Sequence, residues 1–449
     1  MKDNSVIKRN ISIAVVIVTG AILKIAYICY TPVWCRQHDV IDFGAGEGHA
    51  AYIEYILANR ALPDFDPRTV WAFFHPPLHH IIAAIFMGIS SALGVSEGRI
   101  HENVQLLPLT YMILLVIFTY LICKKIGMHY GGMIVTMLTV SFHPMFILMS
   151  GSLNNDALSV MLTVVAIYVA ILWYLYPTMG KVMALAIVMG LAMSAKLSAA
   201  VIAPAIGLLM LYKMYTDSGH LKDRAKRISY FLEFAVFALL VIPLGLWWPV
   251  RNRILFDMPA GYIPEVGEHI EKTGFISTIL DVRTASPFLY MKANGFDHDE
   301  YNLILATVKS ALFDEGDFAG ISRRITYSGW ILFAMAFCLL VIQIVAMIAV
   351  CVSSPSGDDR CIRLFLAAGF VMYLISYLVF AIKGANLSAM NFRYGAAEVA
   401  ILAVFAGLWY DRLRALNKKL AASVVMLSSA GFAAASALFY ILIAKIPPG

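Results

Sequence analysis

The chain contains eleven separate apolar runs, and this feature constrains its fold more than any other. Spanning a bilayer as a helix takes about 20 predominantly apolar residues. The hydrophobic fraction is 61%, the charged fraction is 14% and the mean hydropathy is +0.78, values typical of a polytopic membrane protein and not of a soluble one. The runs lie near residues 11–30, 105–123, 130–149, 156–176, 182–195, 198–212, 229–250, 327–352, 363–382, 395–410 and 420–444. We therefore predict an all-α polytopic membrane protein with about 11 transmembrane helices and outer juxtamembrane helices.

Short basic connectors between the runs predict how the chain is oriented. Lys and Arg concentrate in the cytoplasmic loops of membrane proteins. If the chain starts inside and crosses at each run, all of these connectors fall on that side, and the C-terminus lies outside. The net charge of +6 is then cytoplasmic anchoring charge and gives no support to nucleic-acid binding. The connectors contain Lys2, Lys8, Arg9, Lys124, Lys125, Lys181, the cluster 213–227, Arg360, Arg363, Arg412, Arg414, Lys418 and Lys419.

One further apolar segment, Leu78–Gly94, does not fit this alternation. It is about 17 residues long, near the lower limit for a span. Counting it as a crossing would reverse the side of every basic connector up to Arg227. It also begins with two prolines and two histidines, which suits an interfacial helix. We predict that it stays on the outer face as an interfacial or re-entrant helix.

The resulting topology has two large outer segments, 31–104 and 251–326, and only short inner loops. The working surface is therefore expected outside. We predict a transmembrane module over 1–250 that includes an outer catalytic loop at 31–104, a second outer loop or small cap over 251–326, and C-terminal transmembrane helices over 327–449. A helix is also expected at 49–60, because Tyr52, Tyr55 and Ile56 follow helical spacing.

The first outer segment gathers carboxylates and imidazoles, although ionisable groups are sparse elsewhere in the chain. Asp39 follows the first run by about nine residues and lies next to His38, so we expect it close to the outer interface. A carboxylate in that place can act as a general base that takes a proton from an attacking hydroxyl. The alternative is an ordinary solvated loop carboxylate.

Histidines mark the far end of the same segment. His75 precedes two prolines, and the near-helical spacing of His75, His79 and His80 predicts that some of them share a face. They can bind a divalent metal with Glu47 or His49 as further ligands. Hydrogen bonding to phosphate or hydroxyl groups and simple interfacial packing are alternatives that the spacing leaves open.

A polar turn, Ser150–Asp156, precedes another apolar run on the outer side. Asn155 and Asp156 are candidates to line the same outer cavity as Asp39. The alternative for Asp156 is helix capping, because a carboxylate is favourable beside first-turn amides.

Three cations are expected at the outer ends of spans: Lys196, Arg251 and Arg393. Cations at membrane depth are costly and usually have a partner. A lipid phosphate would supply one, and arginine offers it a bidentate grip. Structural pairing with Glu398 or with an outer-loop acid is the alternative.

Together these features resemble the GT-C class of glycosyltransferases. The resemblance rests on Asp39 soon after the first helix, His75-Pro76-Pro77-Leu78 before an interfacial helix, a polar turn ending in Asp156, and Arg393-Tyr394 before a late span. More narrowly, the chain is similar to bacterial relatives of the protein O-mannosyltransferases and of the lipid A aminoarabinose transferase. The resemblance covers most of the chain and is strongest over 31–210.

The resemblance implies a GT-C-like fold and a polyprenyl-phosphate-linked sugar donor. It also implies that Asp39 is the catalytic or acceptor-activating aspartate and that Asp156 is a second acid facing the cavity. Where the aminoarabinose transferases have a metal-binding Glu followed by a Lys that binds phosphate, this chain has His75 and Pro76. The chain has no room for the extra soluble domain of eukaryotic O-mannosyltransferases, which favours the bacterial plasma membrane.

We therefore predict an inverting glycosyltransferase that moves a sugar from a polyprenyl-phosphate carrier to a hydroxyl of a lipid, glycan or protein at the extracytoplasmic membrane face. In this prediction Asp39 is catalytic, His75 is a possible metal ligand, and no other cofactor is expected. The alternatives are a secondary transporter and a glycan polymerase or ligase. The predicted lipid-phosphate ligands are Lys196, Arg251 and Arg393, and the predicted substrate-binding residues are Asp156, His75, Asn155, His49 and Glu47.

Overall fold

The computed structural model describes residues 2–35, 41–264, 279–280, 282, 286–288, 302–314, 316, 318, 320–353, 357–383 and 387–446. Within these residues every regular element is a helix, which confirms the predicted all-α fold. The elements are α1 (Lys2–Tyr30), α2 (Gly48–Asn59), η1 (Pro67–Thr69), α3 (Leu78–Ala92), α4 (Glu97–Asn103), α5 (Leu106–Lys125), α6 (Tyr130–Phe142), α7 (Pro144–Leu148), α8 (Asp156–Leu175), α9 (Met179–Ala195), η2 (Leu197–Ile202), α10 (Ala203–Asp217), α11 (Arg224–Phe256), α13 (Leu303–Phe313), α14 (Arg323–Val352), α15 (Asp358–Lys383), η3 (Leu387–Met390), η4 (Phe392–Gly395), α16 (Ala397–Ala415) and α17 (Lys419–Ile443).

The predicted apolar runs all form helices, some of them in two consecutive pieces. Among the described residues, 8 helices are long and apolar enough to cross a membrane. The other three predicted runs correspond to α6, which continues into α7, to the 17-residue α9, and to the 19-residue α16 with its charged last turn. The chain is therefore a multi-pass membrane protein.

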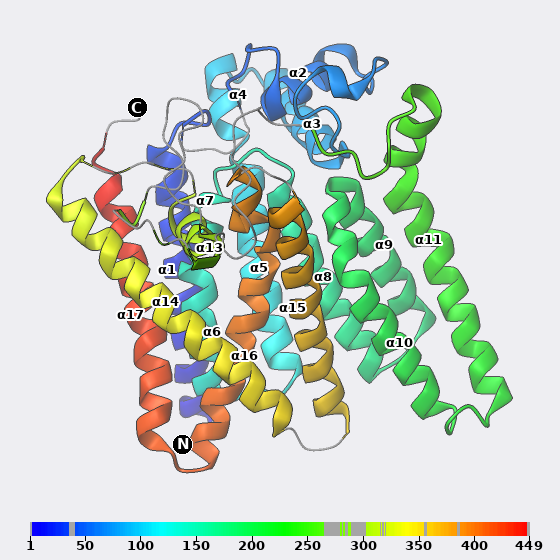
Figure 1. Ribbon diagram of the computed structural model, residues 1–449, viewed down its shortest axis with the longest axis vertical. Helices are drawn as coiled ribbons and strands as arrows, with labels where there is room; N and C mark the ends of the chain where they lie inside the picture. The colour runs from blue at the N-terminus through cyan, green and yellow to red at the C-terminus, as the bar shows by residue number, and fades with distance from the viewer. Residues whose placement is uncertain are drawn as a thin grey trace.

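The helices form one bundle with two distinct ends (Figure 1). The lower end in that view holds the α10–α11 and α16–α17 turns and the lower ends of α5, α14 and α15. These are the places where the basic connectors occur in the sequence. The opposite end holds α2, α3, α4 and the C-terminus. The predicted gathering of basic connectors at one end is thus seen in the fold.

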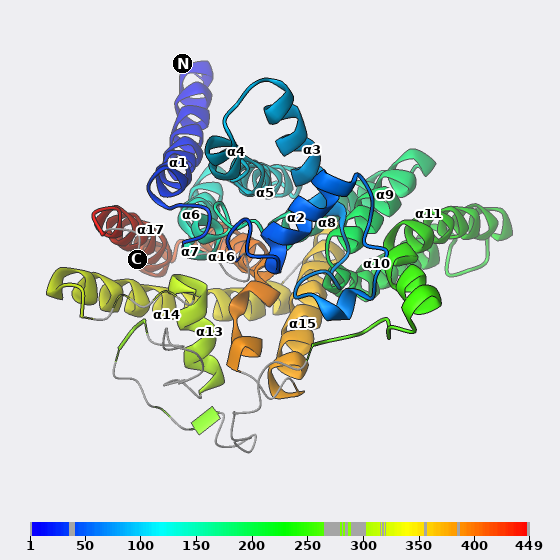
Figure 2. The same cartoon turned by 90° about the horizontal axis from the view of Figure 1, so that it is seen from above.

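Helix α3 lies beside α2 and α4 at the upper end of the bundle and does not cross it, as Figures 1 and 2 show. Its buried side includes Ala83, Ala84 and Met87, which pack with residues of α2 and α4. Ile85 and Ile89, one helical turn apart, are more than half exposed. This one-sided burial is the pattern of an interfacial helix, as the charge alternation predicted.

The sequence analysis treated 130–149 as one continuous span, but the structure breaks this run at Pro144. Proline has no N–H and clashes with the helical turn before it, so α6 ends at Phe142 and α7 begins at Pro144. Side chains from other helices satisfy the carbonyls that the break releases. The Lys24 ammonium donates to Ser141 O at 2.6 Å, and the Ser436 hydroxyl donates to Phe142 O at 2.6 Å.

Helix α16 runs through the middle of the bundle, between α6, α14, α15 and α17 (Figure 2). Its first half is built mainly from small and aliphatic residues and is buried. The backbones of α6 and α16 approach closely, because a Cβ placed on Gly132 would lie 2.5 Å from Gly407 O and one on Gly407 would lie 2.6 Å from Gly132 O. Small residues at such crossings let membrane helices pack tightly. This crossing holds the middle of α16 against α6.

Candidate functional site

The predicted catalytic residue Asp39 lies outside the described residues, within the gap at 36–40. Its role as the base stays a prediction. The other predicted site residues are described, and they occur on α2, on the turn before α3, at the start of α8, at the α9–η2 junction, near the end of α11 and on η4.

A buried ion-pair cluster joins three of the predicted residues. Asp156 is the first residue of α8, and its carboxylate pairs with the ammonium of Lys196 through Oδ1. Its other oxygen, Oδ2, lies 3.9 Å from Arg393 Nε. The side chains are 5% exposed for Asp156, 13% for Lys196 and 8% for Arg393. Charges this buried interact far more strongly than charges in water, so the cluster fixes the positions of its members.

The capping role considered for Asp156 is not what its side chain performs. The N-cap residue of α8 is Asn155, and Asp156 uses its carboxylate for the two ion pairs. The Asp156 N–H is satisfied by the Asn154 side chain, whose Oδ1 accepts at 3.1 Å. The Asn155 amide is turned toward α9, where Nδ2 donates to Ala195 O at 2.7 Å. This polar turn therefore ties the start of α8 to the end of α9.

Breaks between helices bring the two cations to Asp156. Lys196 has an extended backbone (φ −155°, ψ 127°) between α9 and η2. Arg393 is held on η4 by Asn391, whose Oδ1 accepts from Arg393 N at 3.0 Å. The Tyr394 ring supports both cations, since Lys196 Nζ and Arg393 Cζ each lie 4.9 Å from its centroid. Arg393 Nη2 also donates to the Tyr394 hydroxyl at 2.9 Å.

A stack of imidazole rings forms the second part of the site. The His49 ring stacks on His75 and on His80, with centroids 5.4 and 5.1 Å apart. His49 Nδ1 and His80 Nε2 share a hydrogen bond of 2.8 Å. The Tyr52 ring stacks on the His80 ring, with centroids 4.2 Å apart. The predicted sharing of one face by the histidines is thus seen in part, because His79 turns away and bonds Leu153 O through Nε2 at 2.6 Å.

Burial keeps His75, His79 and His80 uncharged at neutral pH. Burial lowers the pKa of His75 well below its usual value, and the positive charge of Lys196 lowers it further. Burial likewise lowers the pKa of His80, with a smaller effect from His49. Burial brings the pKa of His79 to about 4. The bond from His79 to Leu153 O joins the start of α3 to the polar turn that precedes Asp156.

Two other predicted residues have different surroundings. Glu47 is exposed and precedes α2 as its N-cap residue without a side-chain capping bond. Arg251 lies over the rings of Trp248 and Phe256, at 5.0 and 5.6 Å. Its guanidinium donates to Pro63 O and to the neighbouring Asn252 side chain. Arg251 thus fastens α11 to the first outer segment, and its predicted role in phosphate binding stays a prediction.

Metal binding finds little support in the side chains around His75. In the part of the chain that the structure describes, no group of three or more His, Cys, Asp or Glu residues is arranged to hold a metal ion. His49 and His80 use their facing nitrogens for each other. The metal role of His75 stays a prediction.

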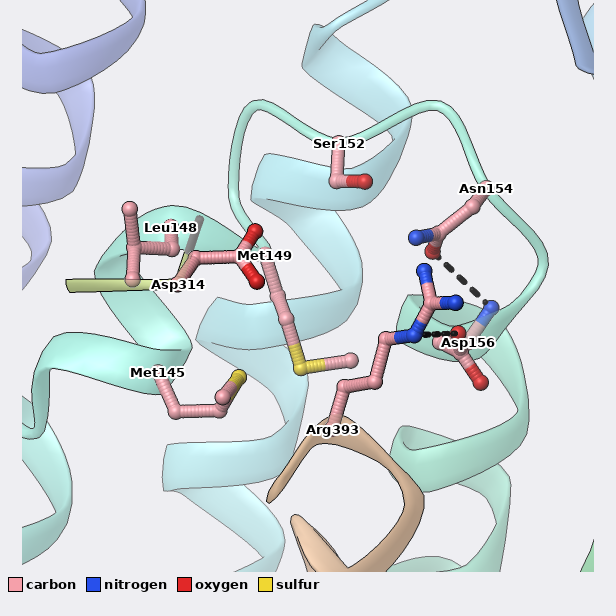
Figure 3. A pocket seen from close by; sticks show the side chains of 8 residues that line it. All are labelled: Met145, Leu148, Met149, Ser152, Asn154, Asp156, Asp314 and Arg393. Carbon is pink, nitrogen blue, oxygen red and sulfur yellow. Dashed lines mark hydrogen bonds and ion pairs between the residues drawn. The ribbon is translucent and has the colours of Figure 1, made fainter. Parts of the chain in front are cut away.

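A small pocket opens beside the ion-pair cluster (Figure 3). In this view Asp156 and Arg393 lie on one side of Met149 and Asp314 lies on the other, with Ser152 above. Its lining residues are Met145, Leu148, Met149, Ser152, Asn154, Asp156, Asp314 and Arg393. The pocket thus combines a sulfur-rich apolar wall with two carboxylates, one guanidinium, an amide and a hydroxyl.

Sequence reasoning did not single out Asp314 or Asn391. Asp314 belongs to an acid-rich part of the second outer segment, where nothing distinguished one carboxylate from the others. Asn391 Nδ2 donates to Asp314 Oδ1 at 2.7 Å across 77 positions of sequence. The only available signal was the position of Asn391 two residues before Arg393.

Comparison with solved structures finds the same fold in ArnT from Cupriavidus metallidurans. In its apo state the TM-score is 0.56 at 14% sequence identity, and the match covers 96% of this chain and 76% of that one. The same protein bound to undecaprenyl phosphate gives a TM-score of 0.54 at 14% identity, with the same coverage. ArnT is a GT-C lipid A aminoarabinose transferase, so the predicted GT-C fold is confirmed. No family model matches the chain. No curated protein matches it in sequence.

Proposed function

We propose that this protein is an inverting glycosyltransferase. It moves a sugar from a polyprenyl-phosphate carrier to an acceptor hydroxyl at the outer face of the bacterial plasma membrane. The observation that carries the proposal is the meeting of Lys196 and Arg393 at Asp156, on a fold shared with a protein that binds undecaprenyl phosphate. The basic connectors mark the other end of α8, since Asp156 is its first residue and the connector with Lys181 follows its last turn, and the positive-inside rule supports an outer position for the cluster.

The charge of the cluster suits a phosphate that carries one negative charge. Two cations and one carboxylate leave a formal charge of +1 in a buried site. A phosphodiester between lipid and sugar brings a charge of about −1, which neutralises the site. Arg393 can offer a planar fork to phosphate oxygens, while Lys196 acts as a point charge. The isoprenoid tail would leave the site between lipid-facing helices.

The reaction then needs little covalent chemistry from the protein. The acceptor oxygen attacks the anomeric carbon, the bond from that carbon to the phosphate oxygen breaks, and the phosphate leaves with the bonding electrons. Lys196 and Arg393 stabilise the charge that develops on the leaving phosphate. Asp39 takes the proton of the acceptor hydroxyl as general base. The His75 and His80 rings, which are neutral because burial lowers their pKa values, form a wall that does not compete for the phosphate.

A transfer assay with purified protein in liposomes tests the proposal. The substrate is undecaprenyl phosphate bearing mannose or aminoarabinose, offered with an envelope extract as the source of acceptor, and the readout is release of undecaprenyl phosphate. We expect turnover with the wild-type protein for one of these donors. Asp39→Asn should abolish turnover while leaving folding intact. Lys196→Met and Arg393→Met should each lower it by at least about 100-fold, the scale for losing one charge-stabilising group.

Arg253→Met is the matched control, because Arg253 is exposed and pairs with Asp257 at the same end of the bundle. Its turnover should equal that of the wild-type protein. Full activity in Asp39→Asn would contradict the assignment of the base. Full activity in both Lys196→Met and Arg393→Met would contradict the phosphate site. Donor-independent uptake of a solute into the liposomes would instead favour a transporter.

A further inference from the structure

The pocket beside the ion-pair cluster has a second carboxylate that the transfer reaction described above does not use. Asp314 lies across the pocket from Arg393 (Figure 3). It follows α13, which packs against α7, η3 and η4. The second outer segment, predicted as a cap, thus contributes a charged group to the same pocket as the first half of the chain.

The backbone at Asp314 is held in a conformation that favours glycine. Its φ is +51° and its ψ is −131°, while its N–H closes the last turn of α13 by donating to Ser310 O at 3.0 Å. A residue other than glycine in such a region costs about 1–3 kcal/mol and is maintained only where surrounding contacts determine it. The contacts of the Asp314 side chain, and not the turn itself, therefore account for an aspartate in this conformation.

Asn391 connects this carboxylate to the phosphate-binding side of the pocket. The Asn391 side chain is fully buried, donates through Nδ2 to Asp314 Oδ1 at 2.7 Å, and accepts through Oδ1 from Arg393 N at 3.0 Å. One amide thus sets the positions of Asp314 and Arg393 relative to each other. Ser310 adds a second tie, since its hydroxyl accepts from Phe392 N at 2.9 Å.

The residues that line the pocket determine which part of the lipid-linked sugar binds on the Arg393 side and which part binds on the Asp314 side. A phosphate is attracted to Lys196 and Arg393 and repelled by a carboxylate, so it does not bind on the Asp314 side. Carboxylate, amide and hydroxyl groups beside an apolar wall suit a ring that carries several hydroxyls, because such a ring presents both C–H faces and O–H donors. Met145, Met149 and Leu148 supply the wall.

We propose that Asp314, held by Asn391, binds the hydroxyl groups of the transferred sugar and so determines the preference for sugar-bearing donor over bare carrier lipid. This inference rests on the proposed function, since it takes the phosphate to lie at Lys196 and Arg393. Asp314 is a binding and specificity residue here, and it takes no part in moving the acceptor proton.

The test compares two kinds of ligand on the full-length protein in nanodiscs. The probes are undecaprenyl phosphate alone and undecaprenyl phosphate bearing mannose or aminoarabinose, with dissociation constants from native mass spectrometry. The wild-type protein should bind one sugar-bearing donor about tenfold or more tightly than the bare lipid, the scale of one hydrogen bond to a charged group. Asp314→Asn and Asp314→Gly should lose this preference and bind the bare lipid as the wild-type protein does.

The two variants separate binding from folding. Asn at position 314 keeps an acceptor for Asn391, so Asp314→Asn should keep the wild-type melting temperature. Asp314→Gly loses that acceptor but relieves the backbone conformation, and because the two effects are of similar size and opposite sign it should also stay folded. Asp257→Asn is the control, because Asp257 also ends a helix with a positive φ of 52° but is exposed outside the pocket. Retained preference in both Asp314 variants would overturn the inference alone, as would equal binding of all probes by the wild-type protein. Failure of the wild-type protein to bind undecaprenyl phosphate would overturn the proposed function, and this inference with it.

Discussion

Asp156→Asn isolates the charge on which the cluster depends. The amide has almost the same shape, but it leaves Lys196 and Arg393 buried without the carboxylate that now lies between them. Removing one partner of a buried ion pair typically costs about 3–5 kcal/mol, because the remaining charge stays desolvated. Both cations keep the Tyr394 ring. We therefore expect a loss near the lower limit, about 3 kcal/mol of unfolding free energy.

The same variant should bind a phosphate more tightly. At an effective dielectric constant of about 20, two like charges about 5 Å apart repel each other by about 3 kcal/mol. Asp156→Asn removes this repulsion and frees both cations. We expect undecaprenyl phosphate to bind at least about tenfold more tightly, a gain of about 1.4 kcal/mol. At equal lipid concentration the lipid should therefore narrow the stability difference between the variant and the wild-type protein by about 1.4 kcal/mol, roughly half of it.

Thermal unfolding in detergent, with and without undecaprenyl phosphate, measures both effects. Without lipid, Asp156→Asn should melt below the wild-type protein, and lipid at about 100 times its dissociation constant should stabilise either protein by about 2.7 kcal/mol. At equal lipid concentration the variant should gain more than the wild-type protein. Asp257→Asn, which changes an exposed carboxylate, should behave as wild type in both conditions. Equal lipid stabilisation of the variant and the wild-type protein would refute a phosphate site at Lys196 and Arg393.

Three further predictions follow from the packing and charge of the fold. Gly132→Val should lower the free energy of unfolding by at least about 3 kcal/mol and reduce the yield of monodisperse protein, because the α6–α16 crossing has no room for a side chain. The control is Gly207→Val, because a Cβ on Gly207 meets nothing within 4 Å, and equal yields of the two variants would contradict the close crossing. The lowered pKa values of His75, His79 and His80 mean that the unfolded chain takes up protons first on acidification, so each histidine should remove up to about 1.4 kcal/mol of stability per pH unit below about 6.5. For His79 this loss of stability continues down to a pH of about 4. Between pH 7.5 and pH 4.5 the melting temperature of His80→Phe should fall less steeply than that of the wild-type protein, and identical slopes would contradict a buried, neutral His80. Arg251→Met should lower the free energy of unfolding by about 1–3 kcal/mol, because the guanidinium fastens Pro63 and Asn252. Undecaprenyl phosphate binding by the same variant tests its predicted role at the phosphate: weaker binding at a lipid-free stability that has fallen no further supports that role, and unchanged binding contradicts it.

Hydropathy and charge predicted the helices of the bundle and the end at which each basic connector lies, because both act along the membrane normal. Apolar length marks each crossing, and basic connectors mark one end of the bundle. The position of Leu78–Gly94 on the outer face, without crossing, therefore followed from the alternation of the basic connectors. The break at Pro144 did not follow, because its cost is offset by Lys24 and Ser436 from other helices. Neither contact has a signal in the local sequence.

The sequence predicted at which end of the helices the site residues lie, but not which of these residues are neighbours within the bundle. Lys196, Arg251 and Arg393 were grouped because all three end spans on the outer side, but hydropathy does not tell which spans are neighbours. In the structure Lys196 and Arg393 share Asp156, while Arg251 has contacts with Pro63 and two aromatic rings. Asp314 was missed for the same reason, since its link to Asn391 joins segments that only the fold brings together.

Native mass spectrometry of the protein purified from its own membrane tests the central claim most directly. The wild-type protein should carry a lipid whose mass equals a polyprenyl phosphate plus one sugar, or the bare polyprenyl phosphate left after transfer. The Lys196→Met, Arg393→Met double variant should carry neither, although it folds and binds ordinary phospholipids. A wild-type protein without any polyprenyl phosphate, or a double variant that retains it fully, would contradict the assignment of this chain as a polyprenyl-phosphate-sugar transferase with its phosphate site at Lys196 and Arg393.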